Sequence, residues 1–216
     1  MPRLHHEGTV FRRSFLSRLG AVFAATGAAI SAAPENAYAQ ASGSGAWTPA
    51  RHPQDDWLDR IPGSHRFVFD TTSPETFDSV LQFASNYFVA NEAGYGPKSN
   101  DLAVVIIARH HSTQFAYNAA IWAKYKNELV KAADVPSLPD FSNRLGELLK
   151  RGVHLGVCQM ATRRIAGTIA KLTAASSVDQ VYEELAANLV SNAHLVPAGI
   201  VVVNRAQERG YSFARA

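Results

Sequence analysis

The stretch "RGVHLGVCQMATRRIAG", residues 151–167, combines a strand-to-helix junction with Cys158, the only cysteine of the chain. Its first part, "VHLGVC", is a short apolar run that predicts a β-strand. The residues that follow place Ile165, Ile169 and Leu172 on one helical face, which predicts an amphipathic helix. A strand that passes directly into a helix is the repeating unit of α/β folds.

The preceding segments repeat this alternation. "HRFVFD", residues 65–70, predicts a strand, and Ser73 as N-cap with Pro74 at the first helical position predicts a helix after it. We expect the loop "NEAGYGPKSND", residues 91–101, to end that helix. The next run, "DLAVVIIA" at 101–108, is continuously apolar and β-branched, as in a strand that is covered on both faces.

Further helices are predicted beyond this strand. One is expected from about Ser112 onward, and another over "FSNRLGELLKRG", residues 141–152, closed by its glycine. A third is expected over residues 176–190, where Ser177 and Gln180 form a capping box. Strands therefore alternate with helices, and the sequence predicts an α/β fold with a mainly parallel sheet.

The C-terminal segment allows two interpretations. "GIVVV", residues 199–203, favours a strand by residue preference. Pro197 just before it and the sequence "NRAQERG" after it favour a helix that ends at Gly210. Local sequence alone leaves both open.

The N-terminus has the features of an export signal. Arg12 and Arg13 precede a small-residue apolar run, and Ala37-Tyr38-Ala39 offers a cleavage site. Because the run is too short for a membrane span of about 20 residues, we expect cleavage rather than stable membrane insertion. The paired arginines resemble a twin-arginine signal, so the export machinery of that route is an expected partner and the periplasm the expected location.

We accordingly divide the chain into residues 1–39, a signal peptide, 40–64, an N-terminal arm, and 65–216, the domain. The arm is rich in Gly, Ser, Pro and charge, and Trp47 and Trp57 are expected to dock parts of it.

Charge and length restrict the function classes. Cleavage after residue 39 leaves 177 of the 216 residues, enough for one domain with a sizeable core. It removes four arginines and two glutamates, so the net charge falls from +3 to +1. The basic character thus belongs largely to the signal, and nucleic-acid binding is not expected.

Candidate site residues lie where predicted strands end. Asp70, then Arg109 with His110 and His111, and then Cys158 each follow a strand. Ligands of open parallel sheets bind beyond the carboxyl ends of the strands, so these residues are expected on one edge.

The role of Cys158 is open from sequence, with a reactive thiol and an inert core thiol as the two main interpretations. A lone cysteine in an oxidising compartment makes no internal disulfide, which leaves an inert buried thiol, a reactive thiol, a metal ligand or an intermolecular bridge. The N-terminus of the following helix favours a thiolate, and Arg163 and Arg164 on its first turns add positive charge. A nucleophilic or sulfur-carrying cysteine needs such surroundings. Free cysteines are nevertheless often core residues.

The neighbouring candidates have weaker signals. His110 is a candidate base or ligand, but adjacent histidines in an extended segment point to opposite faces, so His110 and His111 alone do not predict a metal site. Met160, Cys158 and a histidine would suit a soft copper(I) site. Arg109 would either bind an anion or pair with a nearby carboxylate.

The segment around Cys158 resembles the cysteine motif of the DsrE/DsrF/TusD-like family, in which a Gly-initiated strand ends in Cys and a helix begins at once. "HLVPAGIVVVNRAQERGYSF", residues 194–213, is similar to the tail of that family. The resemblance implies a three-layer domain with a central, mainly parallel five-stranded sheet and assembly into homo-oligomers. It also implies a helix from about 199 to 209, followed by a final strand.

In sulfur-relay members of the family the matching cysteine carries a persulfide, so the resemblance assigns that role to Cys158. The leading hypothesis is a periplasmic sulfur carrier or sulfurtransferase with His110 as proton shuttle and Arg109, Arg163 or Arg164 near the thiolate. Its partners would be a sulfur donor or acceptor protein or a small sulfur compound, with no cofactor or metal. The alternatives are a non-enzymatic binding or interaction module with an inert Cys158, and a copper or zinc binder.

Overall fold

Five parallel strands form the centre of the fold, as the sequence and the family resemblance predict. A computed structural model describes residues 47–174 and 177–216, and its main compact unit runs from Pro49 to Ala216. The spatial order of the strands is β4-β3-β2-β1-β5. Their bounds are β1 His65–Thr71, β2 Leu102–Ala108, β3 His154–Cys158, β4 Ala193–Val196 and β5 Ser212–Arg215.

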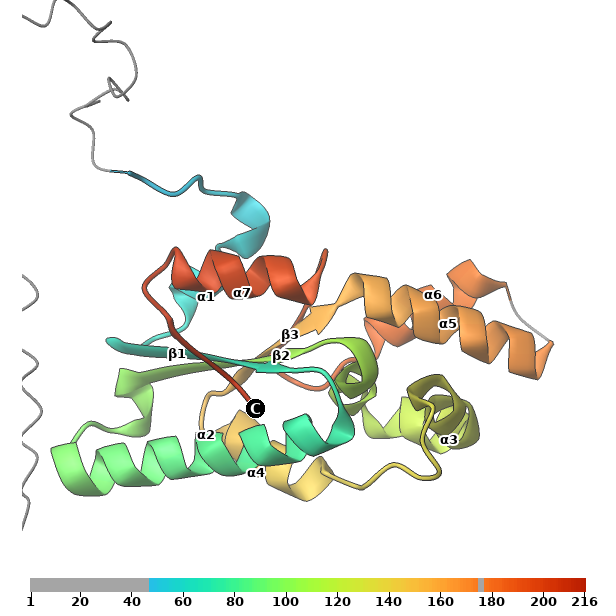
Figure 1. Ribbon diagram of the computed structural model, residues 1–216, viewed down its shortest axis with the longest axis horizontal. Helices are drawn as coiled ribbons and strands as arrows, with labels where there is room; N and C mark the ends of the chain where they lie inside the picture. Colours follow the sequence, from blue (N-terminus) through green and yellow to red (C-terminus); the bar gives the residue numbers. More distant parts are fainter. Residues whose placement is uncertain (1–46, 175–176) are drawn as a thin grey trace, which may run out of the picture. The chain divides into compact units, whose positions relative to one another are not determined.

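Helices cover both faces of this sheet (Figure 1). One face is covered by α2 and α4, the other by α1 and α7, while α3, α5 and α6 pack together beside the sheet. Their bounds are α1 Trp57–Arg60, α2 Pro74–Tyr95, α3 Ala119–Ala133, α4 Ser142–Lys150, α5 Gln159–Thr173, α6 Val178–Ala187 and α7 Gly199–Gln207. Short 3-10 helices occupy η1 Pro53–Asp55, η2 Ser99–Asp101 and η3 His110–Ala116.

The central strand β2 is buried along its whole length. Val104 and Ile106 face the core under α2 and α4, while Val105 and Ile107 face the core under α7. Successive side chains of a strand point to opposite faces, so a strand covered on both sides needs an unbroken apolar run. The prediction from "DLAVVIIA" is confirmed.

The first long helix begins where the sequence indicates but ends later. Ser73 caps α2 through a capping box with Thr76, and Pro74 is its first residue. The expected loop start at Asn91 is wrong, because the helix continues to Tyr95 and ends at Gly96, whose φ of +83° is left-handed. Glycine adopts that conformation without strain and therefore stops the helix.

The segment after β2 also differs from the expectation of a helix from about Ser112. Residues 110–116 form η3, and α3 starts only at Ala119. The side chain of Asn118 accepts hydrogen bonds from the backbone N–H groups of Ala120 and Ile121, so the N-cap lies there.

The C-terminal segment forms a helix, as the family resemblance implies and against the strand preference of "GIVVV". It is α7, and it leads to β5. Strand β4, at one edge of the sheet, was not expected from the sequence.

Part of the predicted arm packs into the domain. Trp57 and Leu58 of α1, with Ile61, are buried in the core that α7 covers, whereas Trp47 is exposed. The predicted signal peptide lies outside the described residues, as does the arm up to residue 46. Among the described helices, none has the length and apolar character needed to cross a membrane.

Candidate functional site

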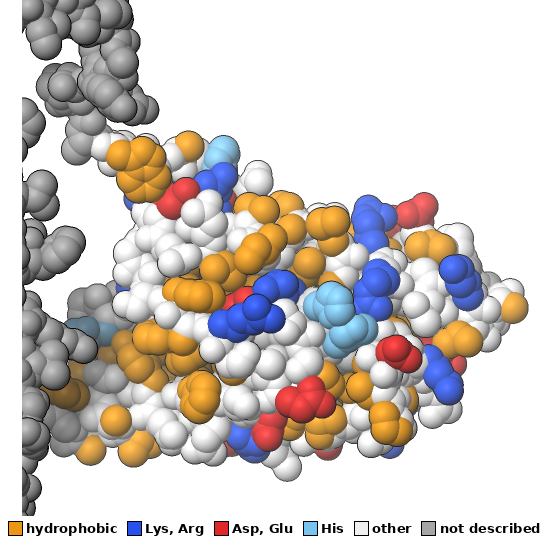
Figure 2. Space-filling model, viewed as in Figure 1, with side chains coloured by type: hydrophobic (Ala, Val, Ile, Leu, Met, Phe, Trp, Pro, Cys, Tyr) orange, Lys and Arg blue, Asp and Glu red, His pale blue; other side chains and the backbone are white. Residues whose placement is uncertain are grey.

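The carboxyl edge of the sheet brings three predicted site residues together. Thr71 of β1 pairs with Ala108 of β2, and Ala108 pairs with Val157 of β3. Arg109 and Cys158 directly follow the last pair, and Asp70 lies one residue before the first. We call Asp70, Arg109 and Cys158 the edge cluster. On the face shown in Figure 2, basic, acidic and histidine side chains gather near the middle of the domain, bordered by apolar ones.

Arg109 is held by Asp70. Its Nε lies 2.7 Å from Oδ1 and its Nη2 2.7 Å from Oδ2 of the carboxylate. The Asp70 side chain is only 2% exposed, whereas that of Arg109 is 22% exposed. The hydrogen bonds to Asp70 raise the pKa of Arg109. Arg109 therefore pairs with a carboxylate, one of the two roles considered from sequence.

The turn after β2 fixes the backbone of Arg109. The Ser112 hydroxyl accepts a hydrogen bond from the Arg109 N–H and lies 2.8 Å from the hydroxyl of Thr71. Ser112 and Thr71 are completely buried. These bonds satisfy polar groups at the junction of β2 with η3 and explain why a 3-10 turn, rather than the expected α-helix, follows the strand.

Cys158 is the N-cap residue of the 15-residue helix α5 and is 7% exposed. Its thiol makes no hydrogen bond with any described residue, and no side chain caps the helix. The Cys158 carbonyl accepts a hydrogen bond from the Thr162 hydroxyl at 3.1 Å, and the phenol of Tyr117 donates to that hydroxyl at 3.2 Å. Cys158 thus stands at the positive end of a helix dipole, at a helix start that no side chain caps.

Helix α7 closes over Arg109 at Gly199. A Cβ built on Gly199 would lie 2.8 Å from Cβ and 2.9 Å from Cδ of Arg109, and 2.9 Å from Cγ2 of Ile107. A side chain at this position would displace the arginine. The small residue therefore lets α7 begin directly beside the edge cluster.

His110 and His111 lie next to the edge cluster and contact each other. Their rings meet edge-on with centroids 4.0 Å apart, and His110 has a φ of +57°. Burial lowers the pKa of His111, and its Nδ1 is buried without a hydrogen-bond partner. Among the contacts of the described residues, none joins His110 to Cys158, so the proton-shuttle role of His110 stays a prediction.

The two arginines of α5 have other partners. Arg163 pairs with Asp179 at 3.4 Å and lies over the ring of Tyr182, with its guanidinium carbon 3.9 Å from the centroid. Arg164 donates to the carbonyl of Ala132 at 2.9 Å and more weakly to that of His110. Of the three arginines expected near the thiolate, Arg109 is the one that the strand register places next to Cys158, because each directly follows one residue of the Ala108–Val157 pair.

The metal hypothesis gains no support from side-chain grouping. Within residues 47–174 and 177–216, no three His, Cys, Asp or Glu side chains lie close enough to hold one ion. Met160, the soft ligand of that alternative, is 68% exposed near the start of α5.

Sequence reasoning missed a stack of aromatic side chains at the other end of β3 and β4. His154 Nδ1 lies 2.9 Å from His194 Nε2, and Trp57 stacks on His194 with ring centroids 4.1 Å apart. The register pairs Gly156 with His194, and His154 lies two residues before Gly156, so both histidines point to the same face of the sheet. Only the pairing of β3 with the unpredicted strand β4 could have revealed this cluster.

The chain matches no protein-family model and no curated protein. Among solved structures, it is similar to a protein of unknown function from Methanobacterium thermoautotrophicum. The two are 15% identical, the TM-score is 0.43, and the match covers 71% of this chain and all of the other.

Proposed function

We propose that this protein is a DsrE-like sulfur handler in which Cys158 accepts a sulfane sulfur and passes it on as a persulfide. The observation that carries the proposal is the position of Cys158, as N-cap of α5 and next to Arg109 at the carboxyl edge of the sheet. Free N–H groups at a helix N-terminus and a nearby guanidinium both favour the thiolate, which is the nucleophilic form of cysteine.

The chemical step is an exchange at the sulfane sulfur. The Cys158 thiolate attacks the terminal sulfur of a hydropersulfide, R–S–SH. A new S–S bond forms at Cys158 while the S–S bond of the donor breaks, and the donor leaves as the thiolate R–S⁻. Cys158 is thereby oxidised to a persulfide and the donor is reduced to a thiol, so no further oxidant is needed.

The geometry favours a small donor. Cys158 is 7% exposed, and α7 begins close to Arg109. A low-molecular-weight hydropersulfide reaches such a thiol more readily than a donor that must insert a folded surface. The proposal further places the protein in the periplasm as a homo-oligomer, with the acceptor docking at the carboxyl edge.

The proposal is tested by exposing the native protein to glutathione hydropersulfide and measuring its intact mass. We expect a gain of one sulfur atom that a reducing thiol removes, and no gain in Cys158→Ser. The alkylation rate of Cys158, measured across pH in native and in urea-unfolded protein, shows whether the thiol is accessible. Native protein that alkylates readily yet never gains sulfur would refute the sulfur-carrying role.

A second candidate function is a non-enzymatic binding module in which Cys158 is an inert core residue. The observation in its favour is that the thiol is largely buried and makes no hydrogen bond with the described residues. Buried cysteines commonly behave as small hydrophobic residues. Alkylation only after unfolding would support this function.

A further inference from the structure

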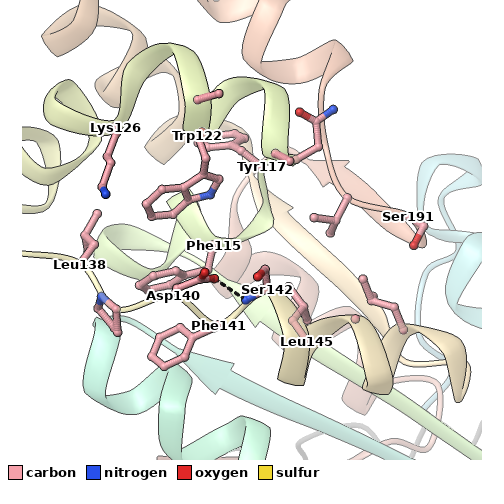
Figure 3. A pocket seen from close by; sticks show the side chains of 17 residues that line it. Phe115, Tyr117, Trp122, Lys126, Leu138, Asp140, Phe141, Ser142, Leu145 and Ser191 are labelled. Atoms are coloured by element: carbon pink, nitrogen blue, oxygen red, sulfur yellow. Dashed lines mark hydrogen bonds between the residues drawn. The ribbon is translucent and has the colours of Figure 1, made fainter.

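A cavity of about 610 Å³ lies between α3, α4 and the segment that joins η3 to α3 (Figure 3). Its volume is within the range of about 300–1,000 Å³ that is typical of small-molecule sites. No member of the edge cluster lines it. The cavity is therefore a separate feature of the domain, and what it binds does not depend on the chemistry of Cys158.

Four aromatic residues line this cavity: Phe115, Tyr117, Trp122 and Phe141. The rings of Phe115 and Trp122 are inclined by 19° with centroids 6.0 Å apart, and Phe141 meets Phe115 at 63° and 4.8 Å. Figure 3 shows Trp122 from α3 on one side and the two phenylalanines on the other. Aromatic walls contact flat ring systems over a large area with favourable stacked or edge-on geometry.

Helix α3 places a charged residue beside these rings. Tyr125 has non-helical backbone angles within the helix, and its hydroxyl donates to Glu184 on α6. Trp122 and Lys126 lie on either side of Tyr125, and both line the cavity. Because they are four residues apart, one apolar and one cationic side chain lie on the same face of the helix and border the same space.

The net charge available to a ligand at this site is positive. Asp140 also lines the cavity, but its carboxylate accepts the backbone N–H of Ser142 at 2.9 Å. Hydrogen bonds from Ser142 lower the pKa of Asp140, with a smaller effect from Lys126. Lys126 is exposed and forms no ion pair with the described residues. The carboxylate therefore has a partner, whereas the ammonium group is available to an anion.

We propose that this cavity binds an aromatic monoanion, a carboxylate or sulfonate, with its ring system among Phe115, Trp122 and Phe141 and its acidic group at Lys126. Burial of the rings supplies most of the affinity, because apolar contact area dominates small-molecule sites. The ion pair with Lys126 selects anions over neutral molecules of the same shape.

Two fluorescent probes that differ in charge test both parts of the proposal. 8-Anilinonaphthalene-1-sulfonate carries the anion, and N-phenyl-1-naphthylamine has the same rings without it. Fluorescence titration of the native protein is expected to show saturable binding of both, with the anionic probe bound more tightly. If neither probe binds, or the neutral probe binds as tightly as the anionic one, the proposal is wrong.

Gly146→Leu tests the location. Gly146 lines the cavity on α4, and a Cβ at this position meets no atom within 4 Å, so leucine has room and suits the helix. We expect at least a tenfold loss of affinity for both probes. Gly94→Leu is the matched control, since Gly94 is an exposed helical residue of α2 whose added Cβ also meets no atom. Unchanged binding in Gly146→Leu, with folding verified by circular dichroism, would overturn the proposal.

Lys126→Gln tests the charge. The loss of one partly exposed ion pair is expected to weaken the anionic probe about fivefold and to leave the neutral probe unchanged. Lys131→Gln, an exposed lysine of the same helix that does not line the cavity, is the control and should change neither. Equal effects of Lys126→Gln on both probes would contradict the assigned role of the ammonium group.

Discussion

Arg109 and Asp70 form a two-point ion pair across the ends of β1 and β2, with both N–O distances at 2.7 Å. The carboxylate is almost fully buried and depends on the guanidinium for its charge partner, whereas the guanidinium retains some exposure. A planar guanidinium matches a carboxylate at two points, which fixes its orientation. The pair therefore sets the position of the positive charge beside Cys158.

Asp70→Asn is expected to reduce the free energy of unfolding by about 3 kcal/mol, because it leaves Arg109 partly buried without its anion. Urea unfolding measures this loss. Asp78→Asn provides the control, since Asp78 pairs with Arg144 at an exposed site and should cost less than about 0.5 kcal/mol. The same Asp70→Asn variant should alkylate faster at Cys158, because the charge of Arg109 is no longer neutralised. Equal stability losses in the two variants would argue against a structural role for the buried pair.

The His154–His194 pair is expected to make the protein less stable in acid. Burial, with smaller effects from His154 and Arg60, lowers the pKa of His194 to about 4, and burial also lowers the pKa of His154. In the unfolded chain a histidine takes up a proton near pH 6.5, so the unfolded state binds more protons between about pH 6.5 and 4. Stability should thus fall as the pH falls through that range and be unaffected by this residue above it.

His194→Gln tests this effect by thermal unfolding at pH 7.5 and pH 4.5. Because the ring is only half buried, solvent screening reduces its contribution to on the order of 1 kcal/mol, or a few degrees in Tm. The variant should show a smaller Tm difference between the two pH values than the natural protein. His65→Gln, at an exposed position, should keep the full difference. A variant with the same pH dependence as the natural protein would show that another group is responsible.

The parts of the fold that were predictable depend on local signals. The strand β2 and the start of α2 were predicted correctly. A strand buried on both faces shows as an unbroken apolar run, and a helix cap shows as Ser73 followed by Pro74, so both signals lie in residues that are adjacent in the sequence. The segment from Gly199 was ambiguous because "GIVVV" prefers a strand, whereas in the folded chain α7 buries Val202 and Val203 against the sheet. Strand β4 is short and only partly buried, which left no apolar pattern to read.

For the candidate site, the sequence predicted only which strand ends carry the site residues. Asp70, Arg109 and Cys158 were expected on one edge because parallel strands share one, but the strand order that makes them neighbours is a property of the folded sheet. The partners of Arg163 and Arg164 lie on other elements, which sequence spacing does not reveal. The cavity beside Trp122 is formed by residues of α3, α4 and the segments around them, which only the folded chain brings together, and it has no motif of its own.

Ser73→Ala is expected to lower the free energy of unfolding by about 1 kcal/mol. The Ser73 hydroxyl accepts a hydrogen bond from the backbone N–H of Thr76 at 3.2 Å, and the Thr76 hydroxyl accepts one from the backbone N–H of Ser73 at 2.9 Å. The two side chains thus satisfy two backbone N–H groups at the start of the helix. Ser79→Ala, within the same helix, is the comparison, because its hydroxyl only donates to the carbonyl of Glu75 and alanine favours the helix interior. In chemical denaturation, Ser79→Ala should have a higher free energy of unfolding than Ser73→Ala. The reverse order would contradict the capping role.

Gly199→Ala is expected to destabilise the protein by about 1–3 kcal/mol and to change the reactivity of Cys158. The added Cβ would meet Arg109 and Ile107 at less than 3.0 Å, so either α7 or the arginine must move. Because Arg109 is fixed by Asp70, a shift of its side chain would strain the ion pair as well. Gly167→Ala, in α5, is the control: its added Cβ meets no atom within 4 Å, and alanine in a helix should stabilise by about 0.5–1 kcal/mol. Urea unfolding and native alkylation of both variants measure these effects. If Gly199→Ala were as stable as Gly167→Ala and alkylated at the natural rate, α7 would not be restrained by its close approach to Arg109.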